Sequence, residues 1–270
     1  MWNEVLRCPV CGAAVKKEEN SLFCEGARRH CFDFSADGYV NLTPAHAAGG
    51  GDDATLIAAR TAFLRGGYYQ PLADRVCEIL RSYVPKGVVL DAGCGEGYYT
   101  NRIAAAGYPV FGFDLSKRGI RTAARAAKRE GQSAHFAVAG IYDLPVADER
   151  ADAVVSLFAP VAEAEFCRVL KKDGVLVVVG AGAEHLFSLK RVLYDVPRKN
   201  EPRADLPRGM QRLHAETLRF EMQLDAPAIA ALFAMTPYYY RTAKEASARL
   251  LALSALSCEA EMDIAVFKKM

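Results

Sequence analysis

Short apolar runs alternate with helix-length segments through the middle of the chain. The apolar runs occupy residues 88–90, 109–113, 134–139, 152–157 and 174–180. Segments with the length and pattern of helices lie between them, at 97–106, 117–130 and 161–170. Because strands that alternate with helices of this length assemble side by side in one direction, the pattern predicts an α/β fold with a parallel, doubly wound sheet.

Two further helices are expected before the first of these strands. The run ATLIAARTAFLR, residues 54–65, contains no helix breaker and ends at Gly66 and Gly67. Pro71 suits the first turn of a second helix, which continues to Tyr83 with its apolar residues on one face.

The first apolar run leads directly into a glycine-rich turn. Residues 88–100 read VVLDAGCGEGYYT, so that Asp91 ends the strand and Gly93, Gly95 and Gly97 follow at alternate positions. Glycines let the main chain approach a ligand closely, and a carboxylate at the strand end can accept hydrogen bonds from that ligand. Strand, turn and helix start together predict a cofactor-binding loop.

The spacing of the glycines separates two classes of cofactor. A dinucleotide-binding turn reads GxGxxG, whereas here the spacing is GxGxG and Tyr98 stands at the third glycine position. The run resembles the first motif of the Rossmann-like S-adenosylmethionine-dependent methyltransferases. Asp114 ends the second apolar strand, where a carboxylate can bind both ribose hydroxyls, although NAD domains share this acid. An NAD domain and a structural turn are the alternatives, and the combination favours the methyltransferase.

A cluster of cysteines near the N-terminus predicts a metal site. Cys8 and Cys11 form a CPVC knuckle, to which Cys24 adds a third thiol. This spacing is typical of a zinc site that a fourth Cys or His completes, and His30 and Cys31 are adjacent candidates. A thioredoxin-like redox pair is the alternative, but it needs a strand before and a helix after the CxxC.

The remaining cysteines have a simpler interpretation. They are scattered through apolar segments and are expected to be core thiols: Cys77, Cys94, Cys167 and Cys258.

Composition and charge narrow the class of protein. The chain has 270 residues, 51% hydrophobic and 24% charged, which suffices for one substantial core and a small appended module. No membrane-length apolar run or secretory hydrophobic region is found, so we expect a cytoplasmic protein without membrane contact. With a net charge of +2, an acidic partner must be met by local patches of cations. The sequence leaves the oligomeric state open, with a homodimer as one option.

These observations divide the chain into three parts. Residues 1–42 are expected to form the zinc-binding module, with a few short strands around the metal and GYVNL, 38–42, as the last of them. Residues 43–68 hold a linker, glycine-rich at 46–53, and the connecting helix. Residues 69–270 form the Rossmann-like methyltransferase domain.

Several motifs in one order sharpen the resemblance to a family. The zinc knuckle is followed by HCFDFSADGYVNL, AARTAFLRGGYYQPL, LDAGCGEGYYT, LFAP and MTPYYYR. This series resembles the bacterial 23S ribosomal RNA guanine-N1 methyltransferases over essentially the whole chain. The resemblance implies methyl transfer from S-adenosylmethionine to N1 of a guanine in hairpin 35 of 23S rRNA, with a zinc module that recognises RNA. The GCGEGYYT form is similar to the guanine 745 class more than to the guanine 748 class.

The resemblance also implies roles for single residues. The histidine of HCFD, His30, completes the zinc site. The cofactor-site positions that it adds to Asp91, Asp114 and the turn glycines are Tyr69, Tyr99, Thr100, Gly140 and His185. Structural roles are the alternatives: a packed aromatic for Tyr69, a buried core histidine for His185 and a plain loop glycine for Gly140.

The expected chemistry is direct attack of guanine N1 on the sulfonium methyl group. N1 carries a proton in the neutral base, so a general base is expected within hydrogen-bond reach. The LFAP run, 157–160, stands where exocyclic-amine methylases carry a polar (D/N)PP(Y/F) motif, and its apolar character fits a ring nitrogen. Asp195 and Glu163 are candidate bases, with solvated surface carboxylates as the alternative, so the base is not assigned.

Contacts with RNA would come from basic patches and exposed aromatics. The cations considered are Arg7, Lys16, Lys17, Arg28, Arg29, Lys190, Arg191, Arg198, Lys199, Arg203, Arg208 and Arg212. The three tyrosines at 238–240 are candidates for stacking on an unpaired base. Two rival functions remain: a zinc-containing methyltransferase of a small molecule or protein, and a non-catalytic RNA-binding relative, against which the intact glycine turn argues.

Overall fold

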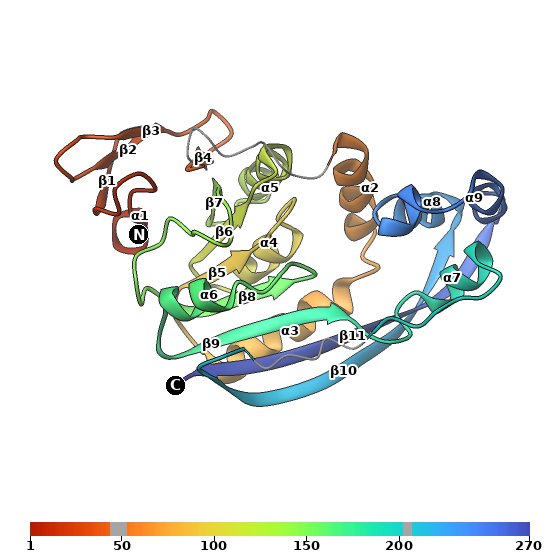
Figure 1. Ribbon diagram of the computed structural model, residues 1–270. Helices are drawn as coiled ribbons and strands as arrows, with labels where there is room; N and C mark the ends of the chain where they lie inside the picture. The colour runs from red at the N-terminus through yellow and green to blue at the C-terminus, as the bar shows by residue number, and fades with distance from the viewer. Residues whose placement is uncertain (44–52, 202–206) are drawn as a thin grey trace.

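The computed structural model describes residues 1–43, 53–201 and 207–270, and builds them around a mixed sheet of eight strands (Figure 1). In spatial order the strands are β10 (Met210–Asp225), β11 (Ala255–Lys269), β9 (Leu170–Ala181), β8 (Ala151–Leu157), β5 (Val89–Ala92), β6 (Val110–Asp114), β7 (Ala134–Val138) and β4 (Val40–Asn41). The strands β4 to β9 are parallel, as the alternating pattern predicted. The order reverses at β5, which has β6 on one side and β8 on the other.

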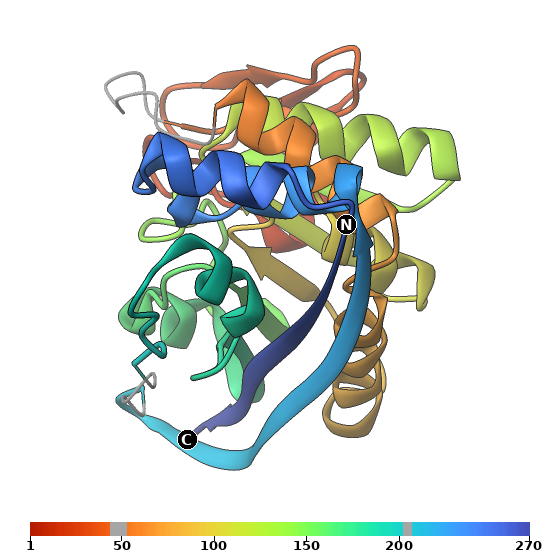
Figure 2. The same ribbon diagram turned by 90° about the vertical axis from the view of Figure 1, so that its right-hand side faces the viewer.

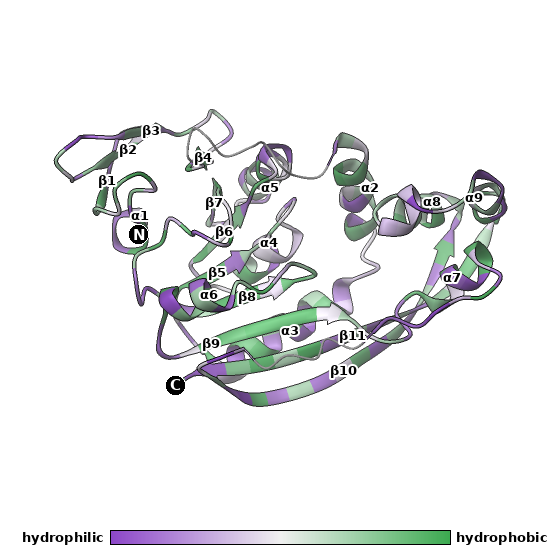
Figure 3. Cartoon of the chain, viewed as in Figure 1, coloured by the Kyte–Doolittle hydropathy of each residue, from purple (hydrophilic) through white to green (hydrophobic). Residues whose placement is uncertain are grey.

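The prediction of a parallel sheet is incomplete at one edge. Strand β11 pairs antiparallel with β9, and β10 pairs antiparallel with β11. In Figure 3, β9 is almost continuously hydrophobic, whereas β10 alternates between hydrophilic and hydrophobic residues. The alternation arises because the outer strand buries one face only, and such a strand carries a weaker signal than a fully buried one.

Helices cover both faces of the parallel strands. The helix α3 (Gln70–Tyr83) packs on the face that carries Val89 and Val110, together with α4 (Tyr98–Ala105). The helix α6 (Glu163–Val169) and the N-terminal segment pack on the face that carries Leu90 and Phe111. Burial on both faces explains why the central strands read as unbroken apolar runs.

A group of helices stands beyond the carboxyl ends of the strands. The helices α8 (Ala226–Ala234) and α9 (Lys244–Leu251) and the 3₁₀ turn η1 (Pro237–Tyr240) are inserted between β10 and β11. Figure 2 shows β10 and β11 running together as two long ribbons towards these helices. The connecting helix α2 (Ala54–Arg65) packs against α8, and α7 (Phe187–Leu193) packs against α9 and β11. The helix α5 (Lys117–Glu130) lies over β6 and β7.

A small three-stranded sheet lies at the N-terminal end. It consists of β1 (Val15–Glu18), β2 (Ser21–Cys24) and β3 (Cys31–Asp33), with α1 (Trp2–Val5) against β1. The expectation that residues 38–42 belong to this sheet is wrong, because Val40 and Asn41 pair with β7 of the main sheet. Val40 is fully buried there, so the apolar strand gains more by extending the large sheet than by joining the small one.

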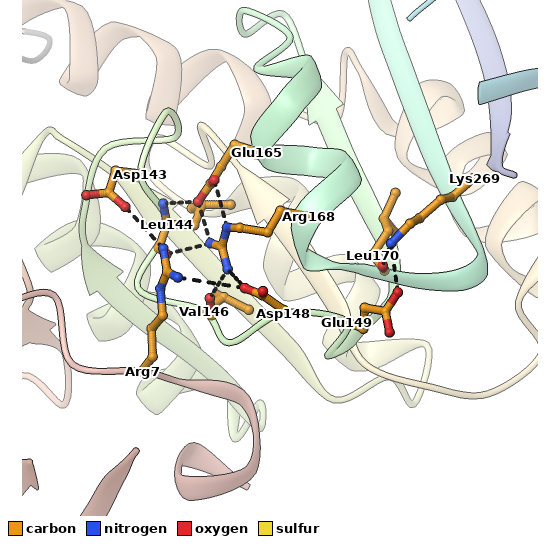
Figure 4. Close-up of polar contacts among 10 residues, drawn as sticks. All are labelled: Arg7, Asp143, Leu144, Val146, Asp148, Glu149, Glu165, Arg168, Leu170 and Lys269. Atoms are coloured by element: carbon orange, nitrogen blue, oxygen red, sulfur yellow. Dashed lines mark hydrogen bonds and ion pairs between the residues drawn. The ribbon is translucent and has the colours of Figure 1, made fainter. Parts of the chain in front are cut away.

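A polar network joins the N-terminal segment to the main sheet (Figure 4). Arg7 forms ion pairs with Asp143 and Asp148, and Arg168 of α6 forms a second ion pair with Asp148 at 2.6 Å. Two backbone hydrogen bonds join the same segments: Arg7 N–H donates to Pro145 O, and Ala147 N–H donates to Val5 O.

The linker expected at 46–53 lies outside the described residues except for Asp53, and the three-part division of the chain stays a prediction. No helix in the described ranges combines the length and hydropathy needed to cross a bilayer.

Candidate functional site

The small sheet gathers four candidate zinc ligands at one point. The ligand atoms of Cys8, Cys11, Cys24 and His30 all lie within 4.8 Å of one another. The Cys11 and Cys24 sulfurs are 3.2 Å apart, and His30 Nδ1 lies 3.5 Å from Cys8 Sγ. These separations approach the edges of a zinc tetrahedron, which are about 3.5–3.8 Å for ligand bonds of about 2.0–2.3 Å.

Cys31, the other candidate for the fourth ligand, points elsewhere. It lies on β3, where its thiol donates to Asp33 Oδ1 at 3.4 Å. The knuckle is tightened by backbone donors, since Val10 N–H and Gly26 N–H donate to the Cys8 and Cys24 sulfurs. A Cβ at Gly26 would come within 3.1 Å of Cys11 Sγ, so a larger residue here would crowd the sulfur. The donor set therefore fits zinc and not a redox pair.

A cavity of about 770 Å³ opens beyond the carboxyl ends of the parallel strands. Each strand from β5 to β9 contributes residues at or just after its end: Gly93, Cys94, Asp114, Leu115, Ala139, Ile141, Leu157, Phe158 and Ala181. The opposite wall comes from α2 and η1, through residues such as Arg60, Tyr238 and Tyr240. Open α/β sheets bind ligands at the carboxyl edge where the strand order reverses, which is the position of this cavity.

The glycine turn forms the floor of the cavity. Gly93, Gly95 and Gly97 all have left-handed backbone conformations, with φ of +87°, +54° and +74°. A Cβ at Gly93 would lie 2.6 Å from the Ala159 side chain, and one at Gly97 would lie 2.5 Å from that of Ala123. Glycine is therefore needed here for backbone geometry and for close packing.

Asp114 is held at the cavity wall by two backbone donors. Gly95 N–H donates to Asp114 Oδ2 at 2.9 Å, and Ser116 N–H donates to Oδ1 at 2.7 Å. The carboxylate therefore links the end of β6 to the glycine turn, in the position expected for a ribose-binding acid.

Asp91 and Thr100 lie behind the floor and not on it. Asp91 is buried and accepts a hydrogen bond from the Thr100 hydroxyl at 2.5 Å. Burial raises the pKa of Asp91 to about 7, against the Thr100 hydrogen bond, which lowers it. Neither side chain lines the cavity, so the structure gives both a supporting position. Gly140 stands between two lining residues, Ala139 and Ile141, and has room for a Cβ.

Tyr69 and His185 meet in the cavity wall, although 116 positions separate them in sequence. Tyr69 Oη lies 3.2 Å from His185 Nε2, and Glu261 N–H donates to His185 Nδ1 at 3.3 Å. Burial lowers the pKa of His185 to about 4, so the ring is neutral and carries its proton on Nε2. Nε2–H therefore donates to the tyrosine oxygen, which leaves the Tyr69 hydroxyl as a donor.

The Tyr99 hydroxyl is another polar group that a ligand can satisfy. It is buried, lines the cavity and has no hydrogen-bond partner among the described residues. Buried polar groups without partners are rare and costly. Together with the glycine turn and Asp114, this hydroxyl fits a polar ligand such as the amino acid and ribose groups of S-adenosylmethionine.

Aromatic residues line the outer part of the cavity. Phe158 follows β8 in a left-handed conformation, with φ of +55°, and is 43% exposed. A non-glycine residue in this conformation costs about 1–3 kcal/mol, and such strain is typical of functional sites. Of the three consecutive tyrosines, Tyr238 and Tyr240 line the cavity and Tyr239 packs against Phe233.

The candidate general bases and some of the cations expected to contact RNA do not lie where their predicted roles require. Glu163 accepts from Arg208 N–H and Asp195 is exposed, and neither lines the cavity, which favours the surface alternative for both. Lys190 is buried and donates to Arg198 O and Asn200 Oδ1, so it does not offer its charge to RNA. Arg203 lies outside the described residues.

Two charged lining residues, Arg60 and Glu96, were missed by the sequence analysis. Arg60 of α2 donates from Nε to Glu96 Oε2 of the glycine turn at 2.5 Å. The available signals were Glu96 within the GCGEG run and Arg60 in the middle of the adjoining AARTAFL motif. Each resembled an ordinary charged surface position until the fold brought α2 over the turn.

Comparison with known families agrees with both parts of the fold. A family described as "Methyltransferase domain" matches residues 89–174, and one described as "RlmA, N-terminal", a zinc ribbon, matches residues 6–48. Among solved structures, the MccD protein shares the fold with a TM-score of 0.51 at 18% identity, covering 74% of this chain and 99% of that one.

Curated relatives match over nearly the full length. A Bacillus subtilis protein is 32% identical over 98% of this chain and 97% of its own, and a Micromonospora griseorubida protein is 35% identical over 92% of both. Their names assign them provisionally to 23S rRNA guanine-N1 methylation.

A Streptomyces fradiae protein, 32% identical over 92% of this chain and 90% of its own, is named 23S rRNA (guanine(748)-N(1))-methyltransferase. The chain therefore belongs to the family of 23S rRNA (guanine-N1)-methyltransferases, which joins a zinc ribbon to a Rossmann-like methyltransferase fold.

Proposed function

We propose that this protein transfers the methyl group of S-adenosylmethionine to N1 of a guanine in 23S rRNA. The observation that carries the proposal is the match to relatives named for this activity over more than nine-tenths of the chain, a span that includes the zinc ribbon and the glycine turn. Since rRNA is made and processed in the cytoplasm, the proposal also places the protein there.

The two halves of the cavity suit the two reactants. S-adenosylmethionine supplies an electrophilic methyl group on a sulfonium. The chain would hold the cofactor with Asp114, the turn glycines and the Tyr69, Tyr99 and His185 group. The mouth, with Phe158, Tyr238 and Tyr240, offers aromatic faces on which an unpaired guanine can stack. Fixing two reactants beside each other in one cavity supplies much of the rate of a direct transfer.

The LFAP run supports a ring nitrogen as the methyl acceptor. Two of its backbone carbonyl oxygens already accept a hydrogen bond from the Ser156 hydroxyl: Ala159 O at 3.3 Å and Pro160 O at 3.2 Å. No carboxylate or amide side chain occupies residues 157–160, where an exocyclic amine would need one. If the apolar LFAP turn contacts the edge of the guanine, the turn offers no side-chain partner for the exocyclic amine, which favours attack through N1.

We infer a target in hairpin 35, at guanine 745. The preference for 745 rests on the GCGEGYYT form of the turn, while one relative is named for guanine 748. The test is methylation of hairpin 35 transcripts in which either guanine is replaced by adenine. Loss of methyl transfer with the 745 replacement alone supports the proposal, and loss with the 748 replacement alone moves the target.

The activity class is tested first in cells that lack the protein and then with the purified protein. Mass spectrometry of 23S rRNA from cells that lack the protein should reveal a missing 1-methylguanosine, which the wild-type gene restores. Methyl transfer to RNA-free extract but not to rRNA would instead support a small-molecule or protein substrate. Cofactor binding without transfer to either would favour the non-catalytic RNA-binding relative.

A further inference from the structure

The cavity wall carries more negatively charged than positively charged side chains. The lining includes two carboxylates, Glu96 and Asp114, while His185 is neutral. Among the described lining residues, Arg60 is the one lysine or arginine. An anionic group of a ligand in this cavity can therefore meet a cationic side chain at one place, the Arg60 guanidinium, which is already ion-paired with Glu96.

Arg60 is fixed directly above the glycine turn. Its Nε donates to Glu96 Oε2 at 2.5 Å, and the two side chains are 24% and 6% exposed. A Cβ at Gly95 would lie 2.6 Å from Arg60 Nη2, so the guanidinium rests against the bare backbone of the turn. The absence of a side chain at Gly95 therefore makes room for the guanidinium as well as for the turn.

We propose that Arg60 binds the α-carboxylate of S-adenosylmethionine, with Glu96 orienting the guanidinium. The inference rests on the proposed function, which supplies the cofactor. The amino acid group of the cofactor is a zwitterion, and the Arg60–Glu96 pair offers one charge of each sign on the cavity wall. Guanidinium groups bind carboxylates through parallel N–H donors, and burial strengthens the contact.

The position of Arg60 links the cofactor site to the helices beyond the carboxyl ends of the strands. Asp53 caps the N-terminus of helix α2, where its side chain accepts from Leu56 N–H at 2.8 Å and from the Tyr240 hydroxyl of η1 at 2.6 Å. Its middle reaches the glycine turn through Arg60, and its outer face packs on α8. A carboxylate bound by Arg60 would hold α2 across the cavity before RNA arrives.

The test compares S-adenosylmethionine with its decarboxylated analogue by calorimetry, without RNA. Wild-type protein should bind the analogue about ten- to a hundredfold more weakly, as for a lost hydrogen bond to a charged group. In Arg60→Met, affinity for S-adenosylmethionine should fall by a similar factor and the difference between the two ligands should disappear. Arg65→Met is the matched control, since Arg65 is exposed on the same helix and does not line the cavity.

Other outcomes would overturn the proposal. Equal affinity of wild-type protein for both ligands would do so without any variant, as would an Arg60→Met protein that still discriminates between them. Arg60→Met with normal cofactor affinity but weakened binding of a hairpin 35 transcript would assign the guanidinium to an RNA phosphate. If Arg60→Met does not fold, Arg60→Lys must keep part of the discrimination. Failure of wild-type protein to bind S-adenosylmethionine at all would reject the proposed function instead.

Discussion

At the scale of single residues, His185 links the cavity to the outer strands of the sheet. Its Nδ1 accepts from the backbone of β11 and its Nε2 meets Tyr69. Protonation of Nδ1 would remove the acceptor for Glu261 N–H, so both the burial and the hydrogen bond favour the neutral ring.

Because His185 is neutral in the folded protein, the free energy of unfolding should depend on pH. The pKa of His185 is about 4 in the folded protein, because of burial, and about 6.5 in an unfolded chain. As pH falls from 7 to 5 the unfolded chain binds the proton first, so the free energy of unfolding decreases. Relative to His185→Asn, which keeps an acceptor near Nδ1, wild-type protein should lose about 2 kcal/mol over this range.

Urea unfolding at pH 7, 6 and 5 measures the difference. Asp91, with a pKa raised to about 7, acts in the opposite direction, since its stability contribution grows as pH falls below 7. It is present in both proteins and cancels from the comparison. A difference between the two proteins that does not change with pH would show that the pKa of His185 is the same in the folded protein and in the unfolded chain.

Asp114 provides a second residue-scale prediction. Asp114→Ala removes the carboxylate and leaves Gly95 N–H and Ser116 N–H without their acceptor. Affinity for S-adenosylmethionine should therefore decrease by about 1–3 kcal/mol, measured by calorimetry. Asp114→Asn retains one acceptor oxygen, so its affinity for S-adenosylmethionine should lie between that of Asp114→Ala and that of wild type. Unchanged affinity in the alanine variant, or tight binding of NAD by wild type, would contradict the assignment.

At the scale of elements, the zinc sheet is continuous with the main core. Cys8 and Cys24 belong to the same buried cluster as Leu90 and Phe111, and Trp2 packs edge-on against Phe111. Metal binding at this position therefore stabilises an element that covers one face of the main sheet.

Removal of zinc should accordingly lower the stability of the whole chain. We expect one zinc per chain by elemental analysis, released in His30→Ala and retained in Cys31→Ser. The His30→Ala protein should melt at a lower temperature in a single transition that includes the methyltransferase core. Two separate transitions, or zinc loss in Cys31→Ser but not in His30→Ala, would contradict the structural arrangement.

The same scale shows what the sequence could and could not supply. The bounds of α2 and α5 agree with local signals, Gly66 after α2 and Ser116 and Gly131 around α5. The acid Asp114 ends β6, whereas β5 continues one residue beyond Asp91, to Ala92. Long-range pairing decides three other features: β4 joins the main sheet, β10 pairs with β11, and Arg60 contacts Glu96. No pattern within a short window of residues contains that information.

At the scale of the whole molecule, the net charge of +2 conceals a strongly basic surface on α5. The helix exposes Lys117, Arg118, Arg121, Arg125, Lys128 and Arg129. It begins just after Asp114 and Leu115 at the cavity, and Arg121 and Arg125 bind Asp37 of the N-terminal region. Several cations named from the sequence also form ion pairs, such as Arg7 with Asp143 and Arg29 with Glu18.

Under the proposed function, this basic surface is the expected path of the RNA backbone between the cavity and the zinc sheet. Replacing Lys117, Arg118 and Lys128 by glutamine should weaken hairpin 35 binding and reduce the slope of log K against log salt by about 2, for about three lost phosphate contacts. S-adenosylmethionine affinity should not change, because these side chains do not line the cavity. Lys86→Gln with Lys172→Gln is the control, since both residues are exposed beside the amino ends of strands, opposite the cavity. An unchanged salt slope in the α5 variant, or an equal loss in the control, would show that the RNA approaches from another face.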